Sequence, residues 1–202
     1  LPAPTVLADV VETVWGCATT RRISMAITTF QGPVRSLNGF YTQGPGSVIN
    51  LPDATNTITL DVATYAGRII RTNDATLVIT LPSLNATADP VSSGPGSDPN
   101  TLNNMGVSFT FLVETAATTW KIITAASQFL AGSLLVIDTD TTDTVNGFAS
   151  DSAATRSVNL NGTTKGGIVG SYVTVTALNS TMWAVSGVVI GSGTIVTPFA
   201  AS

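Results

Sequence analysis

Short strand-like segments follow one another through most of this chain, with no helical segment of ordinary length between them. Residues 106–114 are typical, because Val107, Phe109, Phe111 and Val113 recur at every second position, as in a strand with one buried face. Comparable runs, bounded by turn residues, occupy residues 57–62, 68–72, 76–81, 120–125, 133–138, 155–160, 171–177, 181–186 and 187–190. This succession predicts an all-β fold, an antiparallel sandwich, jelly roll or β-tulip-like domain.

Residues 65–82, YAGRIIRTNDATLVITLP, read as the entry to that domain. Gly67 lets the chain turn in, and Asn73 and Asp74 tolerate turn conformations between two short strands. Pro82 ends the second strand because it has no N–H to donate. The stretch therefore predicts a β-hairpin.

The chain divides into two parts in this interpretation. Residues 1–50 form an extended N-terminal arm, although helical spacing of apolar residues in 1–16 leaves a helical turn possible there. Residues 51–202 form the β-rich domain, which is expected to project. Within it, residues 85–104 are a polar Ser/Gly/Pro/Asp/Asn insertion, too polar to bury.

The chain is 44% hydrophobic but only 10% charged, against roughly 25% in ordinary soluble domains. Monomers that diffuse freely use surface charge for solubility. A surface covered by neighbouring subunits needs less of it, so the deficit favours permanent assembly. The alternative is a β protein that is merely rich in threonine.

The net charge of −4 argues against a nucleic-acid partner, which requires clustered Lys and Arg. The apolar runs are also shorter than the roughly 20 residues that span a bilayer. Charge is uneven: residues 1–71 sum to +1 and residues 72–202 to −5. This asymmetry indicates that the first part docks on a partner and the second faces water. The docking candidates are Arg21, Arg22, Arg35, Phe40 and Tyr41.

No catalytic constellation is visible. The chain has no histidine, so His-dependent nucleophilic catalysis is excluded, and Cys17, the one cysteine, is interpreted as a buried small hydrophobe. Asp138, Asp140 and Asp143 lie in an oxygen-rich DTDTTD loop but lack the Glu and Gly of an EF-hand, so a solvated turn is favoured over a Ca²⁺ site. The GTTKGG segment lacks the spacing of a phosphate-binding loop. No enzyme activity, cofactor or metal is predicted.

Four segments taken together resemble a known family. AGRIIRTNDATLVITLP, GVSFTFLVETAATTWKIITA, DTVNGFAS and GGIVGSYVTVTALNSTMWAVSG, in this order, resemble the small β modules of tailed-phage virion proteins. Such modules occur in head decoration (cement) proteins and in tail or head fibres, usually as trimers. The similarity covers about residues 55–192, whereas the long 85–104 insertion departs from the compact module.

The resemblance implies a structural protein on the outer surface of a phage capsid, a homotrimer that binds the major capsid protein and stabilises the head lattice. Two alternatives remain open. One is a fibre or receptor-binding module whose loops at 85–104 and 138–167 contact host glycan. The other is a non-viral extracellular filament subunit that donates its N-terminal strand to a neighbour.

Four residues of the β domain are candidates for the trimer interface or the core. Trp120 and Trp183 lie within strand patterns, where each would bury roughly 150–250 Å². Arg68 and Arg71 are three residues apart on one strand, so they face opposite sides. One of them is therefore expected to point toward the interior or a subunit interface, where it needs an acidic partner.

Overall fold

The computed structural model describes residues 48–51, 57–86, 104–140 and 144–201. These residues form two β-sheets and one helical turn, α1 (Val62–Tyr65), which Asp61 caps by accepting from the N–H of Thr64. The strands are β1 (Val48–Asn50), β2 (Thr57–Thr59), β3 (Ile69–Thr72), β4 (Thr76–Thr80), β5 (Ser108–Val113), β6 (Thr119–Ile123), β7 (Phe129–Asp138), β8 (Val145–Ala149), β9 (Ser157–Leu160), β10 (Tyr172–Asn179), β11 (Met182–Gly191) and β12 (Phe199–Ala200). The predicted all-β class is confirmed. The described residues contain no helix long and apolar enough to cross a membrane.

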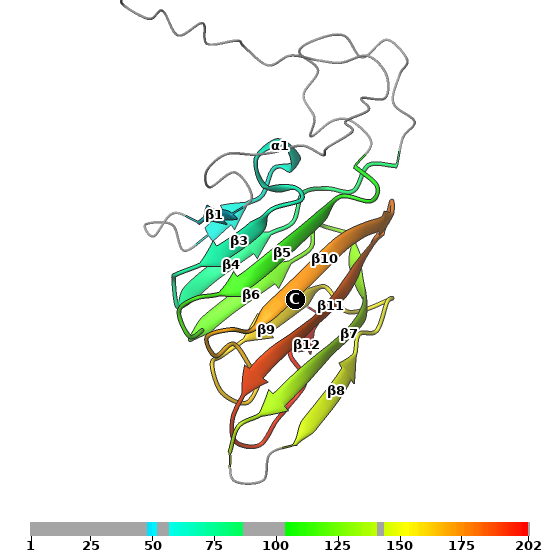
Figure 1. The fold of residues 1–202 in the computed structure, drawn as a ribbon. Coiled ribbons are helices and arrows are strands. Elements are labelled where there is room, and N and C mark those ends of the chain that lie inside the picture. Colours follow the sequence, from blue (N-terminus) through cyan, green and yellow to red (C-terminus); the bar gives the residue numbers. More distant parts are fainter. Residues whose placement is uncertain (1–47, 52–56, 87–103, 141–143, 202) are drawn as a thin grey trace, which may run out of the picture. The chain divides into compact units, whose positions relative to one another are not determined.

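The two sheets differ in size. Sheet A has seven strands in the order β1-β3-β5-β10-β11-β7-β8, and sheet B has five in the order β12-β9-β6-β4-β2 (Figure 1). The sequence led us to expect antiparallel pairing throughout, but several of the strand pairs are parallel. Parallel ladders join β1 to β3, β3 to β5, β2 to β4, β4 to β6 and β7 to β11, and the other ladders are antiparallel. Both sheets are therefore mixed.

The predicted hairpin of residues 65–82 is wrong. Strand β3 belongs to sheet A and β4 to sheet B, so the link at residues 73–75 crosses from one sheet to the other. Three extended residues reach about 10 Å, which matches the separation of packed sheets. Asp74 Oδ1 accepts from the N–H of Thr76 at 2.9 Å and fixes this crossing. Strand β3 therefore forms its ladder with β5, and β4 forms its ladder with β6, instead of the two pairing with each other.

The crossings stack on one another. Strands β1, β3 and β5 lie in sheet A and each is followed by a strand of sheet B, so successive pairs form layers. Between two layers, the N–H groups of Thr118 and Thr119 donate to the carbonyl of Ala75 at 2.7 and 3.1 Å. The opposite sheet thus provides the long crossover that parallel strands need. Strand β1 pairs with β3, so Val48–Asn50 lies in sheet A. The arm expected at 1–50 lies otherwise outside the described residues.

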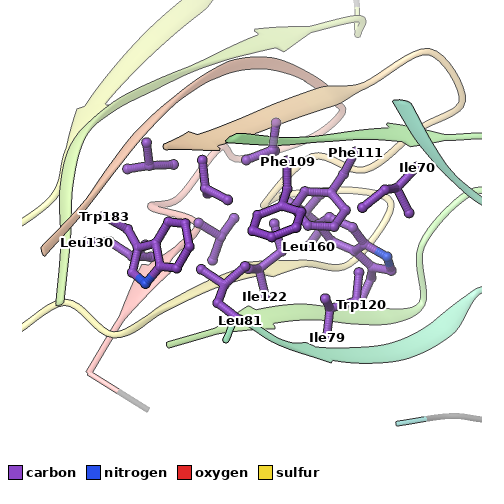
Figure 2. Close-up of a cluster of buried hydrophobic side chains, with 14 of the residues drawn as sticks. Ile70, Ile79, Leu81, Phe109, Phe111, Trp120, Ile122, Leu130, Leu160 and Trp183 are labelled. Atoms are coloured by element: carbon purple, nitrogen blue, oxygen red, sulfur yellow. The ribbon is translucent and has the colours of Figure 1, made fainter. Parts of the chain in front are cut away.

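The core lies between the sheets, where the inward residues of both meet. Strand β5 supplies two aromatic rings from sheet A, and each packs on a tryptophan. Phe109 lies 5.8 Å from Trp183, and Phe111 lies 6.0 Å from Trp120 in an edge-to-face arrangement. Figure 2 shows the two phenylalanines lying between the two tryptophans. Aliphatic side chains from both sheets surround them, including Ile70, Ile79, Leu81, Ile122, Leu130 and Leu160. This packing holds the sheets in place and leaves their outer faces to interact with other molecules.

Candidate docking surface

The outer face of sheet A is almost free of charge. Among all residues of the twelve described strands, only Arg71, Lys121 and Asp138 are charged. Arg71 alone belongs to the outer face of sheet A, because Asp138 ends β7 on the inward side and Lys121 belongs to sheet B. The other described acids lie in loops and turns rather than in the strands of this face.

An apolar band crosses this face. In register across four strands, Leu112 lies beside Tyr172, Tyr172 beside Val188, and Val188 beside Leu135. Tyr172 and Leu135 are 44% and 45% exposed. We use "apolar band" for these four residues together with three on the neighbouring row, namely Ile137, Val145 and Ile190.

The apolar band continues into a row of small polar residues. Thr110 and Thr174 lie side by side on β5 and β10 with their hydroxyls 3.1 Å apart, and Ser186 and Ser133 extend the row over β11 and β7. Short hydroxyl side chains keep a sheet face flat and can hydrogen-bond to a facing surface. The outer face of sheet A therefore combines exposed apolar surface with neutral polar groups.

Exposed apolar patches of this kind commonly mark protein–protein contacts. Val145 is 65% exposed at the edge of the band, where contact of its apolar side chain with water is unfavourable. Covering such side chains contributes about 25 cal/mol per Å² of apolar area. Tyr172 adds a rigid aromatic ring with a polar tip, a residue type that is enriched among interface anchors.

The charge of Arg71 on this face is matched locally. Its guanidinium pairs with the carboxylate of Glu114, which follows β5. Arg71 lies between the inward-facing Ile70 and Thr72, so its side chain points outward rather than into the core. Glu114 is therefore its acidic partner, but in an exposed pair and not in the interior of this chain. Arg68 precedes β3, is partly exposed, and makes no ion pair with the described residues.

Both tryptophans expected at a core or trimer interface lie in the core of this chain. Trp183 donates from Nε1 to Gln128 Oε1 at 3.3 Å, whereas Trp120 Nε1 is buried without a partner. The docking candidates Arg21, Arg22, Arg35, Phe40 and Tyr41, and also Cys17, lie outside the described residues.

The acidic loop lies at the end of β7. Asp138 is buried and accepts from the N–H of Asp140, while Asp143 lies outside the described residues. Over the described part of the chain, no three His, Cys, Asp or Glu side chains gather in a way that could hold a metal ion.

The sequence contained a signal for the apolar band that was not used. Residues 133–138, SLLVID, are apolar at both parities, and Leu135 and Ile137 face outward between the inward Leu134 and Val136. A strand that is apolar on both faces indicates that something covers the outer one.

Comparisons with known proteins add no relative: no family model matches this chain, and no curated protein or solved structure is significantly similar to it.

Proposed function

We propose that this chain is a structural protein of a virion, a decoration (cement) protein that binds the outer surface of a capsid as a homotrimer. The observation that carries the proposal is the outer face of sheet A, which exposes an apolar band and carries no unpaired charge. The low charge of the whole chain and the resemblance of residues 55–192 to virion β modules support it.

A second copy of this chain is the occupant that fits this face best. Two copies that each carry a net charge of −4 repel when acidic surfaces meet. The outer face of sheet A avoids that repulsion, because its one charged side chain is paired with Glu114. Apolar band against apolar band buries the exposed side chains of both copies. Three copies arranged about a threefold axis, with their three apolar bands meeting at that axis, give the trimer that the resemblance implies.

Cementing then follows from mass action. A protein that binds only the assembled lattice stabilises the lattice by its binding free energy. Three linked copies add avidity, so no single contact with the major capsid protein has to be strong. No catalytic group is required for this role.

The first experiment measures the mass of the full chain in solution by analytical ultracentrifugation. The variant Tyr172→Lys places a charge in the centre of the apolar band and is expected to weaken association by at least about 2 kcal/mol, roughly thirtyfold in the dissociation constant. Thr57→Lys is the matched control, since it adds the same charge on exposed β2 of sheet B. A wild-type chain that stays monomeric at all concentrations would contradict self-association through this face.

The second experiment concerns the particle. Imaging of the native virion is expected to show the chain distributed over the head, and its removal is expected to lower the melting temperature of the capsid. Copies confined to one vertex or to the tail would instead identify the fibre module that the sequence left as an alternative. A helical polymer with the N-terminal residues paired to a neighbour's sheet would identify the filament subunit.

A further inference from the structure

A cavity of about 380 Å³ opens on the other side of the molecule, on the outer face of sheet B. Lys121 of β6 lines it, in register between Val78 of β4 and Asn159 of β9. Lys165, from the loop after β9, lines it as well. The chain contains no other lysine. Strand pairing thus brings together two residues that lie far apart in the sequence. We call this cavity the lysine pocket; its lining is Val78, Thr118, Thr119, Trp120, Lys121, Asn159, Leu160, Asn161 and Lys165.

The loop that carries Lys165 is held in one conformation. Asn161 Oδ1 accepts from the backbone N–H of Lys165 at 2.9 Å. Gly162 has a φ of +72°, and a Cβ built there would lie 2.2 Å from the carbonyl oxygen of Ala117. The loop therefore packs against the residues before β6 so closely that only glycine fits. This packing fixes the backbone that carries Lys165 at the cavity.

None of the described residues that line the lysine pocket is acidic. Neither ammonium group makes a hydrogen bond or an ion pair, and Arg71–Glu114 is the ion pair formed among the described residues. Two like charges that share a cavity repel each other, and an anion between them relieves that repulsion. In a chain of net charge −4, this is a local positive site with a free-energy reason to attract an anion.

The remaining lining decides what kind of anion fits. Val78 gives the cavity an apolar side, while Thr118 and Thr119 provide hydroxyl groups. Asn159 Oδ1 is an acceptor without a partner. A pyranose ring has the matching chemistry, an apolar face and a rim of hydroxyls that can donate. The volume is at the lower end of the range of about 300–1,000 Å³ for ligand sites, which suits one sugar unit rather than a nucleotide.

We propose that the lysine pocket binds a carboxylated sugar unit of an acidic glycan, with Lys121 and Lys165 holding the carboxylate. Lysine suits this role because its ammonium is a compact charge that does not demand the planar geometry of a guanidinium contact. The site gives the chain a glycan-binding activity in addition to the structural role. It does not depend on the proposed self-association, because the two surfaces belong to different sheets.

The test is a calorimetric titration of the full chain with D-glucuronate, with D-glucose as the uncharged sugar and sodium sulfate as the anion without a sugar. Saturable binding of glucuronate is expected, with glucose at least about tenfold weaker, equivalent to about 1.4 kcal/mol. Lys165→Met and Lys121→Met are each expected to weaken glucuronate binding about tenfold. Arg68→Met is the matched control, because it removes one unpaired positive charge elsewhere and is expected to change nothing.

Three outcomes would overturn the proposal. Glucose binding as tight as that of glucuronate would mean that the lysines recognise no charge. Sulfate binding with the affinity of glucuronate would mean an adventitious ion only. Unchanged binding in both methionine variants would place the sugar elsewhere. If a methionine variant fails to fold, Lys165→Arg keeps the charge and is expected to bind within about threefold of wild type; a thermal melt of each variant separates folding from binding. Wild-type mass in the ultracentrifuge reports on self-association independently of every one of these results.

Discussion

The outer faces of the two sheets are built from similar strands but present opposite chemistry. Sheet A exposes Tyr172, Leu135 and their neighbours with no unpaired charge, whereas sheet B places both lysines of the chain around one cavity. Flat neutral apolar surface suits a large contact with another protein, while a concave charged site suits a small anion. Because the two surfaces lie on different sheets, the proposed self-association and the proposed anion binding do not compete for the same residues.

The inner faces differ as well. The tryptophan of sheet A, Trp183, has a hydrogen-bond partner in Gln128, and the tryptophan of sheet B, Trp120, has none. Each packs on one phenylalanine of β5. The two halves of the core therefore have similar apolar packing, but the indole N–H group is hydrogen-bonded in one half and lacks a partner in the other.

The largest effect is expected where sheet A depends on a missing side chain. Gly132 of β7 has a φ of +145°, and a Cβ there would lie 2.0 Å from the carbonyl oxygen of Val185 on β11. Gly132→Ala forces β7 and β11 apart and is expected to lower the free energy of unfolding by about 3 kcal/mol or more. Urea denaturation followed by tryptophan fluorescence measures this. Gly147→Ala on neighbouring β8 is the control, because its Cβ meets Leu135 at an ordinary 3.6 Å. Equal losses in the two variants would contradict the close approach of β7 and β11.

The two tryptophans provide the next test. Trp183→Phe leaves Gln128 Oε1 without its donor, whereas Trp120→Phe removes an N–H that has no partner. Both variants lose similar volume, so the difference reports the hydrogen bond. Trp183→Phe is expected to be more destabilising by about 2 kcal/mol. Chemical denaturation of both variants gives the difference in the free energy of unfolding directly. A larger decrease in Trp120→Phe would mean that the Nε1–H of Trp120, and not that of Trp183, makes the stabilising hydrogen bond.

Much of the strand content could be predicted from the sequence, because alternation is a local signal. Phe109, Phe111 and Val113 face inward as their spacing predicted. The pairing of strands could not be predicted in the same way. A hairpin and a crossing between sheets place apolar residues at the same spacing, and the short link around Asp74 suits either. The choice depends on β5, which pairs with β3 from beyond the polar insertion at residues 85–104.

The two surfaces were hidden for a similar reason. Lys121 and Lys165 carry no local motif, and only the register of β6 with β9 and the packing of Gly162 on Ala117 bring them to one cavity. The GTTKGG segment lacks the spacing of a phosphate loop, and its Gly162 instead packs on Ala117 and fixes the loop that carries Lys165. Ionic and apolar surfaces assembled from distant strands leave no pattern that a local window can detect.

Salt separates the two faces. Raising the ionic strength from 0.1 M to 1 M shortens the Debye length from about 10 Å to about 3 Å. Glucuronate binding at the lysine pocket is expected to weaken about fivefold, or about 1 kcal/mol. Self-association through the apolar band is expected to stay within about twofold, because burial of apolar surface is not screened. Calorimetry and ultracentrifugation in the same two buffers check this, and parallel weakening of both would mean that the outer face of sheet A binds through charge.

The smallest effect concerns the one ion pair on sheet A. Arg71 and Glu114 are 39% and 41% exposed, so solvent screens their attraction. A double-mutant cycle with Arg71→Met and Glu114→Gln is expected to give a coupling of only about 0.5 kcal/mol in the free energy of unfolding. Glu114→Gln alone leaves the charge of Arg71 unmatched on the outer face, so it is expected to weaken self-association although the fold is hardly changed. The double variant restores a neutral face and is expected to associate as wild type does. If Glu114→Gln associates as tightly as wild type, the neutrality of this face is not what brings two copies together.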